Sequence, residues 1–234
     1  MSKRNVAVVL AGGKGSRMGG DTPKQFFIVK GRTLLEYSVG AFDSNPLIDE
    51  IVIVSHKDYI KRVQELVRLG GFRKVAHILE GGKERYDSSL AAIRQYDGED
   101  VNLIFHDAAR PLVSQRIIDD VVEALKHDRA CGVAMPSVDT ILVCENGYLQ
   151  SVPDRNTMYR AQTPQGFDIK AIQQAYAIGL QDPAFTATDD CGILLKYCPE
   201  IPISIIRGDD ANLKVTYHDD LHLLETYLNN QVQR

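Results

Sequence analysis

The sequence predicts an α/β protein, a three-layer α/β/α sandwich built around a mostly parallel sheet. Two observations support this fold class: short, continuously apolar segments alternate with helical patterns, and the apolar segments are rich in Val and Ile. Strands that are apolar on both faces are typical of parallel sheets that helices cover on both sides. The alternation of strand and helix therefore predicts a layer of helices on each face of the sheet.

Five apolar segments are expected to form the first strands: Asn5–Leu10, Ile51–Ser55, Val75–Leu79, Val101–Phe105 and Gly132–Met135. Helical spacing of apolar residues predicts four helices between them: Thr33–Phe42, Asp58–Leu69, Glu84–Gln95 and Ser114–His127. Ser114 is the expected N-cap of the fourth helix, because a serine hydroxyl can accept a hydrogen bond from the first helical turn.

The strand–helix alternation stops after Thr140, where a β-hairpin is predicted. The segments Thr140–Cys144 and Tyr148–Val152 flank an Asn-Gly pair, which is a strong signal for a tight turn. We expect this hairpin to project from the domain as an arm, at about residues 138–158. The remaining predicted elements are helices at Ile169–Ile178 and Asp189–Tyr197, a strand at Ile203–Arg207 and a helix from His218 to about Asn230. No linker-like tract divides the sequence, so residues 1–234 are predicted to form a single domain.

The composition excludes several classes of protein. The chain has 234 residues, of which 27 are basic and 31 acidic, and its formal charge is −4. This balance argues against a general nucleic-acid-binding protein, which needs a positive footprint to replace counterions. No apolar run approaches the roughly 20 residues that cross a bilayer, and the N-terminus does not resemble a signal peptide. The four cysteines form no C-x-x-C pair, so we expect free thiols and a cytoplasmic protein without membrane partners.

A glycine-rich and basic segment follows the first predicted strand. It runs Leu10-Ala11-Gly12-Gly13-Lys14-Gly15-Ser16-Arg17-Met18 and is followed by Pro23-Lys24-Gln25. Open α/β sheets bind ligands at the carboxyl ends of their strands, and glycines let backbone N–H groups approach an anion closely. With Lys14, Arg17 and Lys24 nearby, the segment favours a triphosphate. The P-loop pattern G-x-x-x-x-G-K-[ST] is absent. The segment does not match G-x-G-x-x-G either, since Met18 stands where the third glycine belongs.

Further polar motifs also lie near predicted element ends. In Phe105–Pro111 (FHDAARP), a carboxylate and a guanidinium could hold Mg²⁺ and phosphate, or could form a structural ion pair. In Gly81–Ser89 (GGKERYDSS), small residues at a helix start could bind an anion or a polar ring edge, or could form a simple turn. Polar clusters at residues 154–156, 162–165, 188–190 and 212–216 are weak signals individually, and Thr188-Asp189-Asp190 is more typical of a helix cap.

Taken together, these motifs resemble the 2-C-methyl-D-erythritol 4-phosphate cytidylyltransferases of the non-mevalonate isoprenoid pathway. The opening A-G-G-x-G-x-R-M loop with P-K-Q is shared with other sugar-phosphate nucleotidylyltransferases, whereas GGKERYDSS, HDAARP, VDT, DRNTMYRAQTPQGF, TDD and NLKVT are more specific in combination. The resemblance extends from residue 10 to residue 216 and implies a Rossmann-like nucleotidyltransferase sheet with a projecting arm.

The resemblance implies transfer of CMP from CTP to 2-C-methyl-D-erythritol 4-phosphate, with release of pyrophosphate. Arg17, Lys24 and Lys214 would be catalytic, stabilising charge on the reacting phosphates. The implied CTP-binding residues are Ala11, Gly12, Gly13, Gly15, Gly82, Lys83, Ser88, Asp107 and Ala108, and the implied acceptor-binding residues are Arg110, Thr140, Arg155 and Thr163. Mg²⁺ is the expected cofactor, held mainly by the CTP phosphates, with Asp107 as the candidate protein contact. The arm is expected to join a C2 homodimer and to carry Arg155 to the neighbouring site.

Three alternatives remain open. Ribitol 5-phosphate is the alternative acceptor, because pentitol-phosphate cytidylyltransferases are close relatives; the two alanines Ala108 and Ala109 fit the methylerythritol branch better. A dinucleotide-binding oxidoreductase would need a third glycine in the first loop and an acidic residue after the second strand, where Ser55-His56 stand. An inactive nucleotide-binding homologue would have lost Arg17, Lys24 or Lys214, and all three are present.

Overall fold

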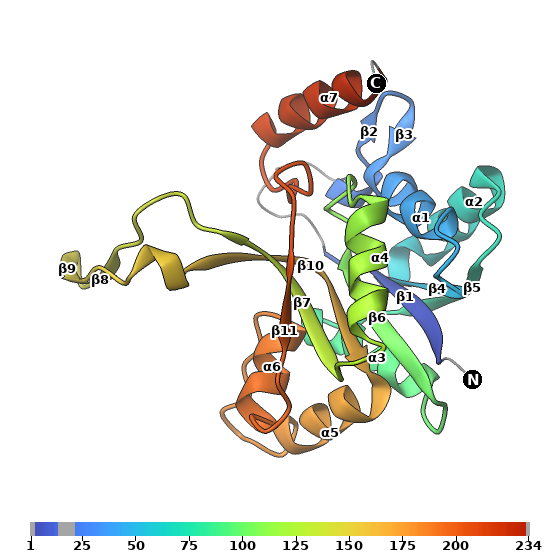
Figure 1. Ribbon diagram of the computed structural model, residues 1–234. Helices are drawn as coiled ribbons and strands as arrows, with labels where there is room; N and C mark the ends of the chain where they lie inside the picture. The colour runs from blue at the N-terminus through green and yellow to red at the C-terminus, as the bar shows by residue number, and fades with distance from the viewer. Residues whose placement is uncertain (1–2, 14–21, 233–234) are drawn as a thin grey trace.

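A seven-stranded sheet forms the centre of the computed structural model, which describes residues 3–13 and 22–232 (Figure 1). The strand order is β11-β7-β10-β6-β1-β4-β5. The strands are β1 Arg4–Ala11, β4 Glu50–Ser55, β5 Val75–Glu80, β6 Val101–Asp107, β7 Ala130–Pro136, β10 Tyr159–Asp168 and β11 Ser204–Arg207. Neighbouring strands are parallel except for β10, which is antiparallel to both β6 and β7. The predicted mostly parallel sheet is therefore confirmed.

Helices cover both faces of this sheet. One apolar cluster joins the sheet to α1 (Leu34–Asp43), α2 (Ile60–Gly70) and α4 (Gln115–Ala124). The cluster on the opposite face joins it to α3 (Arg85–Gln95), α5 (Ile169–Gly179) and α6 (Asp190–Tyr197). A smaller cluster packs the C-terminal helix α7 (Asp219–Val232) against the short hairpin of β2 (Ile28–Val29) and β3 (Arg32–Thr33). The predicted three layers are thus present.

Local sequence accounts for helix α4 in detail. Ile117, Ile118, Val121 and Val122 are buried against the sheet, as their helical spacing predicts. The Ser114 hydroxyl accepts a hydrogen bond of 3.3 Å from the backbone N–H of Ile117, so the predicted N-cap is confirmed. Short 3₁₀ helices occur at Lys24–Phe26 (η2), Lys57–Tyr59 (η3) and Arg155–Thr157 (η4). Strand β5 was expected to be buried on both faces, but it is an edge strand and only partly covered.

Strand β10 is the main element that the sequence pattern does not predict. Its Gln-Thr-Pro-Gln-Gly run is rich in turn-forming residues, yet the strand pairs on both sides. A register shift between Ala161 and Gln165 interrupts its pairing with β7 around Pro164, which has no N–H to donate. Because β10 runs antiparallel, its middle residues lie beside the carboxyl end of β6.

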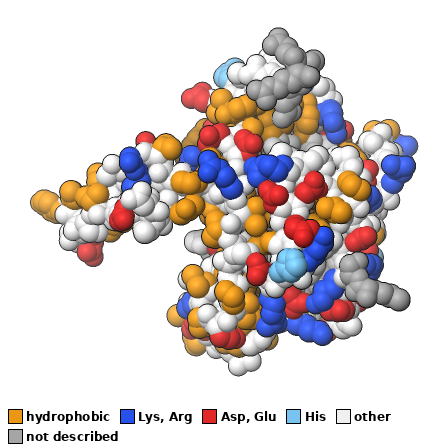
Figure 2. Space-filling view, in the orientation of Figure 1, with side chains coloured by type: hydrophobic (Ala, Val, Ile, Leu, Met, Phe, Trp, Pro, Cys, Tyr) orange, Lys and Arg blue, Asp and Glu red, His pale blue; other side chains and the backbone are white. Residues whose placement is uncertain are grey.

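The predicted hairpin is present and projects away from the sheet as an arm (Figure 1). Its strands are shorter than predicted, with β8 at Val143–Glu145 and β9 at Tyr148–Ser151. Asn146 and Gly147 have φ values of 52° and 83°, the left-handed conformation that a tight two-residue turn requires. Apolar side chains, including Leu142, Val143 and Leu149, are exposed along the arm (Figure 2).

Candidate active site

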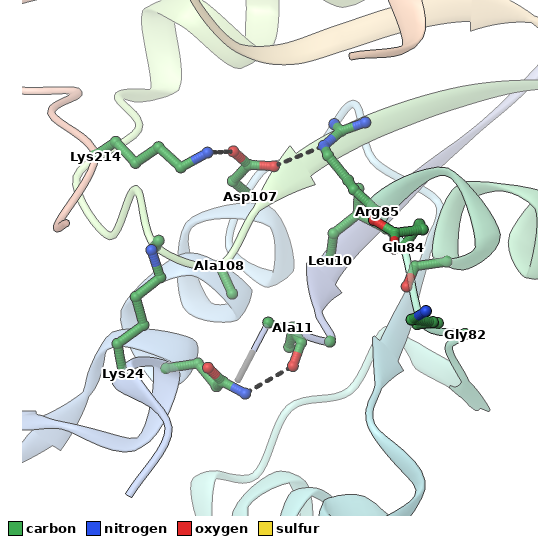
Figure 3. Close-up of a pocket in the computed structure, with 15 residues that line it drawn as sticks. Leu10, Ala11, Lys24, Gly82, Glu84, Arg85, Asp107, Ala108 and Lys214 are labelled. Atoms are coloured by element: carbon green, nitrogen blue, oxygen red, sulfur yellow. Dashed lines mark hydrogen bonds and ion pairs between the residues drawn. The ribbon is translucent and has the colours of Figure 1, made fainter. Parts of the chain in front are cut away.

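A cavity of about 220 Å³ lies at the carboxyl edge of the sheet (Figure 3). The ends of β1 and β6, the start of α3, the helix η2 and the loop after β11 contribute its walls. The lining residues are Leu10, Ala11, Gly12, Gly13, Lys24, Gln25, Gly82, Lys83, Glu84, Arg85, Ser88, Asp107, Ala108, Ala109 and Lys214. The cavity therefore sits where open α/β sheets bind their ligands.

One wall of the cavity brings backbone from β1 close to the start of α3. A Cβ atom added at Gly12 would lie 3.1 Å from the Ser88 hydroxyl oxygen, and one at Gly82 would lie 2.3 Å from the Asp87 Cβ. Asp87 cannot easily give way, because its carboxylate accepts a 2.9 Å hydrogen bond from the backbone N–H of Glu84 at the helix start. The glycines therefore leave backbone groups and the Ser88 hydroxyl at the cavity, an arrangement that suits a flat polar ring.

The Asp107 carboxylate lies between two cationic side chains that approach it from opposite sides (Figure 3). The Lys214 ammonium lies 2.6 Å from Oδ2, and the Arg85 Nε lies 3.4 Å from Oδ1. Burial would raise the pKa of Asp107, but the charges of Arg85 and Lys214 outweigh it and hold the pKa well below its usual range. Asp107 is therefore a carboxylate at neutral pH.

Lys24 and Lys214 are far apart in the sequence but lie close together at the carboxyl edge of the sheet, where backbone groups hold their segments in place. The Lys24 ammonium donates a 3.1 Å hydrogen bond to the carbonyl of Val215, and the Val215 N–H donates a 2.8 Å hydrogen bond to the carbonyl of Ala109. Val215 is fully buried, so the loop that carries Lys214 is tied to the loop after β6. With Lys83, Lys24 and Lys214 make three lysines that line one cavity, which suits the negative charge of phosphate groups.

Most of the residues that the resemblance singled out for catalysis and CTP line this cavity. They are Ala11, Gly12, Gly13, Lys24, Gly82, Lys83, Ser88, Asp107, Ala108 and Lys214. Gly15 and Arg17 lie outside the described residues. The cavity joins the glycine loop, which favoured a triphosphate by itself, to the GGKERYDSS and FHDAARP segments, which were each ambiguous when taken singly.

Thr163 lies next to Asp107 but does not line the cavity. Its hydroxyl accepts a 3.1 Å hydrogen bond from the Asp107 N–H and lies 3.0 Å from the Nδ1 of His106. Burial lowers the pKa of His106 to about 4, so the ring is neutral at pH 7. Since the His106 Nε2 can donate to the Arg110 carbonyl at 2.9 Å, Nδ1 is left to accept from Thr163. The predicted acceptor contact of Thr163 stays a prediction.

Arg110 is buried beneath the same edge rather than in the cavity wall. Its Nη1 and Nη2 donate to the carbonyls of Asn212, at 2.8 Å, and of Ala161, at 3.2 Å. Its Nε is buried and has no hydrogen-bond partner among the described residues. In this conformation Arg110 holds the loop before α7 against β10, and its predicted acceptor contact stays a prediction.

Thr140 and Arg155 belong to the exposed arm, away from the cavity of their own chain. Arg155 begins η4, and its Nη1 donates a 3.3 Å hydrogen bond to the carbonyl of Val138 on the other branch of the arm. Neither residue lines the cavity of its own chain. Their role in the site of a neighbouring subunit stays a prediction.

Arg85 is the main site residue that sequence reasoning did not assign. It lines the cavity and pairs with both Asp107 and Asp190. A signal for it exists, because a cation is disfavoured at the N-terminus of a helix, where the helix dipole is positive. An arginine in the first position of α3 therefore indicates nearby carboxylates. Glu84, Gln25, Leu10 and Ala109 also line the cavity without having been assigned a role.

The comparisons with known proteins agree with this geometry. The family model described as 2-C-methyl-D-erythritol 4-phosphate cytidylyltransferase (IspD) matches residues 5–230. A protein of that name from Thermobifida fusca (strain YX) is 44% identical over 232 residues, which cover 96% of this chain and 93% of the relative. The bifunctional ribulose 5-phosphate reductase/CDP-ribitol pyrophosphorylase Bcs1 of Haemophilus influenzae is 40% identical over 226 residues, which cover 95% of this chain and 48% of the relative.

A solved structure extends the agreement to three dimensions. The 4-diphosphocytidyl-2C-methyl-D-erythritol synthase of Anaerococcus prevotii DSM 20548 matches with a TM-score of 0.85 at 25% identity, over 97% of this chain and 96% of that one. The family model and the two relatives thus span the motifs that form the cavity. The chain belongs to the 2-C-methyl-D-erythritol 4-phosphate cytidylyltransferase family.

Proposed function

We propose that this protein transfers CMP from CTP to 2-C-methyl-D-erythritol 4-phosphate and releases pyrophosphate. The observation that carries the proposal is the cavity itself, where Lys24, Lys214 and Asp107 meet the glycine backbone at the end of β1. In the reaction, a phosphate oxygen of the acceptor attacks the α-phosphorus of CTP. The new P–O bond forms as the bond from the α-phosphorus to the bridging oxygen breaks, and pyrophosphate leaves with that electron pair.

The cavity offers a place for each part of CTP. Backbone groups around Gly12 and Gly82 and the Ser88 hydroxyl would contact cytosine, because the close approach of α3 to β1 leaves a narrow wall. Such a site favours a pyrimidine, and its buried polar groups penalise a base with mismatched donors. The ammonium groups of Lys24 and Lys214 would stabilise the charge that develops on the phosphates. Gly15 and Arg17 would extend the triphosphate contacts, a role that rests on the sequence.

Mg²⁺ is the cofactor that fits these residues. Magnesium in nucleotide sites takes one or two carboxylates and obtains its other ligands from phosphates and water. Asp107 is ionised and lines the cavity, so it would supply a carboxylate oxygen. No group of three or more His, Cys, Asp or Glu side chains that could hold a metal occurs in residues 3–13 and 22–232, so the other ligands in this proposal come from CTP and water. When bound, Mg²⁺ neutralises phosphate oxygens.

We further propose that the arm joins two copies of the chain. A two-stranded ribbon is marginally stable by itself, and the arm exposes Leu142, Val143 and Leu149 to water. A second arm would cover these side chains, and C2 symmetry would make the contact reciprocal. The same arrangement would bring Thr140 and Arg155 to the acceptor site of the other subunit, where Arg110 and Thr163 are the proposed contacts on the subunit that binds CTP.

We place the reaction in the cytoplasm. The four cysteines are free thiols, as a reducing compartment favours. Burial raises the pKa of Cys131 to about 12 and also raises that of Cys198, so both stay protonated and unreactive. In the part of the chain that the structure describes, no helix has the length and apolarity to cross a bilayer.

Ribitol 5-phosphate is the second candidate acceptor. The observation in its favour is the 40% identity to the Haemophilus protein named as a CDP-ribitol pyrophosphorylase. Both acceptors present a phosphate monoester on a polyol, so the same lysines would serve either reaction. The difference lies in the polyol chain, which the proposed contacts from the arm would recognise.

A pyrophosphate-release assay tests the proposal. The protein is incubated with CTP, Mg²⁺ and either 2-C-methyl-D-erythritol 4-phosphate or ribitol 5-phosphate, and the CDP-alcohol is identified by mass spectrometry. We expect faster turnover with methylerythritol phosphate, no turnover with EDTA, and recovery when Mg²⁺ is restored. Faster turnover with ribitol phosphate would favour the second acceptor, and equal rates with ATP or GTP in place of CTP would contradict the proposed nucleotide.

A further inference from the structure

A chain of charged groups runs from the carboxylate in the cavity to a fully buried carboxylate behind it. Arg85, the first residue of α3, donates from Nη1 to the Asp190 carboxylate at 2.6 Å, and its Nε lies 3.4 Å from Asp107. Asp190 begins α6 and has no exposed surface. Arg85 therefore connects a fully buried carboxylate to the carboxylate in the cavity.

Asp190 is itself held from two further elements. The hydroxyl of Tyr176, on α5, donates a 2.7 Å hydrogen bond to Asp190 Oδ1, opposite the oxygen that Arg85 occupies. The side-chain oxygen of Gln165, on β10, accepts a 3.1 Å hydrogen bond from the Asp190 backbone N–H. Tyr176, Gln165 and Asp190 do not line the cavity, and the side-chain contacts of Asp190 connect them to it through Arg85.

The Arg85 guanidinium contacts two carboxylates, and this distinguishes it from the arginine of an ordinary ion pair. An arginine that served to neutralise one carboxylate would favour a bidentate pair, with two nitrogens on one group. Arg85 instead divides its donors between Asp190 and Asp107, and its Nη2 is buried without a hydrogen-bond partner among the described residues. A buried charge is costly unless its partners are well placed, so Asp190 restricts where the guanidinium can lie.

We propose that Arg85 is a positioning residue for cytidylyl transfer, and that the buried Tyr176–Asp190 pair holds it so that the Asp107 carboxylate stays fixed in the cavity. This inference rests on the proposed function, in which Asp107 contacts the ribose or Mg²⁺ side of CTP. Without Arg85, Asp107 would be held mainly by Lys214, a flexible side chain that is also proposed to contact the reacting phosphates. The carboxylate would then move with that lysine during the reaction.

Two buried tyrosines provide a matched test. Tyr176 and Tyr96 are 1% and 2% exposed, and each donates its hydroxyl to a carboxylate, Asp190 in one case and Glu50 in the other. Tyr96 packs between α3 and the edge of the sheet, and neither it nor Glu50 lines the cavity. Each Tyr→Phe substitution therefore removes one hydrogen bond to a carboxylate and preserves the ring.

Steady-state kinetics and thermal unfolding are measured for both variants. We expect Tyr176→Phe to lower kcat by about tenfold, since a hydrogen bond to a charged group is lost from the chain that ends at Asp107. Tyr96→Phe should keep kcat within about twofold while losing a comparable amount of thermal stability. A Tyr176→Phe protein whose kcat is within twofold of the wild-type value, or no lower than that of Tyr96→Phe, and whose CTP affinity is unchanged would overturn the proposal.

A double-mutant cycle tests whether Tyr176 acts through Arg85. Arg85→Lys keeps the charge but lacks the fork that reaches two carboxylates, so its kcat should fall at least about tenfold. Adding Tyr176→Phe to Arg85→Lys should then lower kcat by less than about twofold, because coupled residues are not additive. Independent, multiplying losses would show that Tyr176 does not act through Arg85.

Calorimetric titration with CTP and Mg²⁺ separates this inference from the proposed function. If the wild-type protein neither binds CTP nor turns it over, the proposed function fails and the inference fails with it. If the wild-type protein is active and Tyr176→Phe matches it in both kcat and CTP affinity, the inference alone fails. A weaker CTP affinity of Tyr176→Phe, with Tyr96→Phe unchanged, supports the inference independently of turnover.

Discussion

The cavity and the arm are two regions of the same chain with opposite physical character. The cavity is formed by the ends of strands whose residues are almost completely buried, and its Asp107 carboxylate is paired with Lys214 and Arg85. The arm consists of two short strands whose residues are all exposed, and its apolar side chains face water. The cavity is supported by the packing of its own domain, whereas no surface of the described chain covers the arm.

In the proposed dimer, this difference would separate what one subunit supplies from what two supply. Rigid strand ends can hold Asp107 and Lys214 in a fixed geometry because neighbouring strands and loops are hydrogen-bonded to one another. Arg155 lies on an exposed segment with little packing of its own, so its position depends on whatever covers the arm. We therefore expect substitutions in the cavity to affect the chemical step and substitutions in the arm to affect assembly and acceptor binding.

The largest expected effect concerns two of the three lysines that line the cavity, Lys24 and Lys214. Lys24→Ala and Lys214→Ala each remove a charge from the place where negative charge develops in the transition state. Loss of one such contact should lower kcat by roughly 100–1,000-fold, or about 2.7–4 kcal/mol. Lys126→Ala, at an exposed position after α4, is the matched control and should leave kcat unchanged. A loss of less than threefold for either cavity lysine would remove it from the catalytic group.

The second prediction concerns the histidine behind Asp107. Burial lowers the pKa of His106 from its ordinary value of 6.5 to about 4, so the unfolded chain binds a proton at a higher pH than the folded one. The stability that this group contributes is complete above pH 6.5 and is lost as the pH falls toward 4, by up to about 3 kcal/mol. Urea unfolding between pH 7 and pH 4.5 measures this slope. His106→Gln should show a shallower slope, and an unchanged slope would contradict the assignment.

The third prediction tests the arm as an interface. Leu149 is 58% exposed on the arm, and Leu195 is 62% exposed on α6. If a second copy covers the arm, Leu149→Ser should cost about 1.5–3 kcal/mol per buried leucine and raise the dimer dissociation constant at least tenfold. Leu195→Ser should leave the dimer intact. Light scattering across a dilution series gives the dimer dissociation constant of the wild-type protein and of each variant. A wild-type protein that is monomeric at all concentrations would exclude the dimer.

The smallest expected effect concerns Arg155 and the acceptor. Arg155→Ala should raise the KM for the acceptor by about tenfold, the loss of one charge-assisted contact, and leave CTP binding nearly unchanged. At acceptor concentrations below the wild-type KM, mixing Arg155→Ala chains with Lys24→Ala chains should give a kcat/KM above that of either parent, because a hybrid dimer has one site in which both residues are intact. Hybrid dimers whose kcat/KM does not exceed that of the Arg155→Ala parent would place Arg155 in its own subunit's site or in none.

Local patterns in the sequence account for most elements of this fold. The apolar run Asn5–Leu10, the helical spacing in α4 and the Asn146-Gly147 turn are each set by neighbouring residues, so their periods and turn chemistry can be recognised without knowledge of the partners. Strand β10 lacks such a pattern, because pairing on both sides compensates for the interruption at Pro164. Long-range pairing with β6 and β7 therefore determined that β10 forms a strand, although its local sequence disfavours one.

The sequence by itself determined the fold class, the positions of the motifs and the resemblance to the cytidylyltransferase family. The tertiary structure decided which motifs meet, because parallel strands bring their carboxyl ends to one edge regardless of their separation in the chain. It also decided that Lys24 and Lys214 share a cavity and that Arg85 spans Asp107 and Asp190. Contacts between residues so far apart leave no local period in the sequence, and the pairing of charges depends on burial that only packing creates.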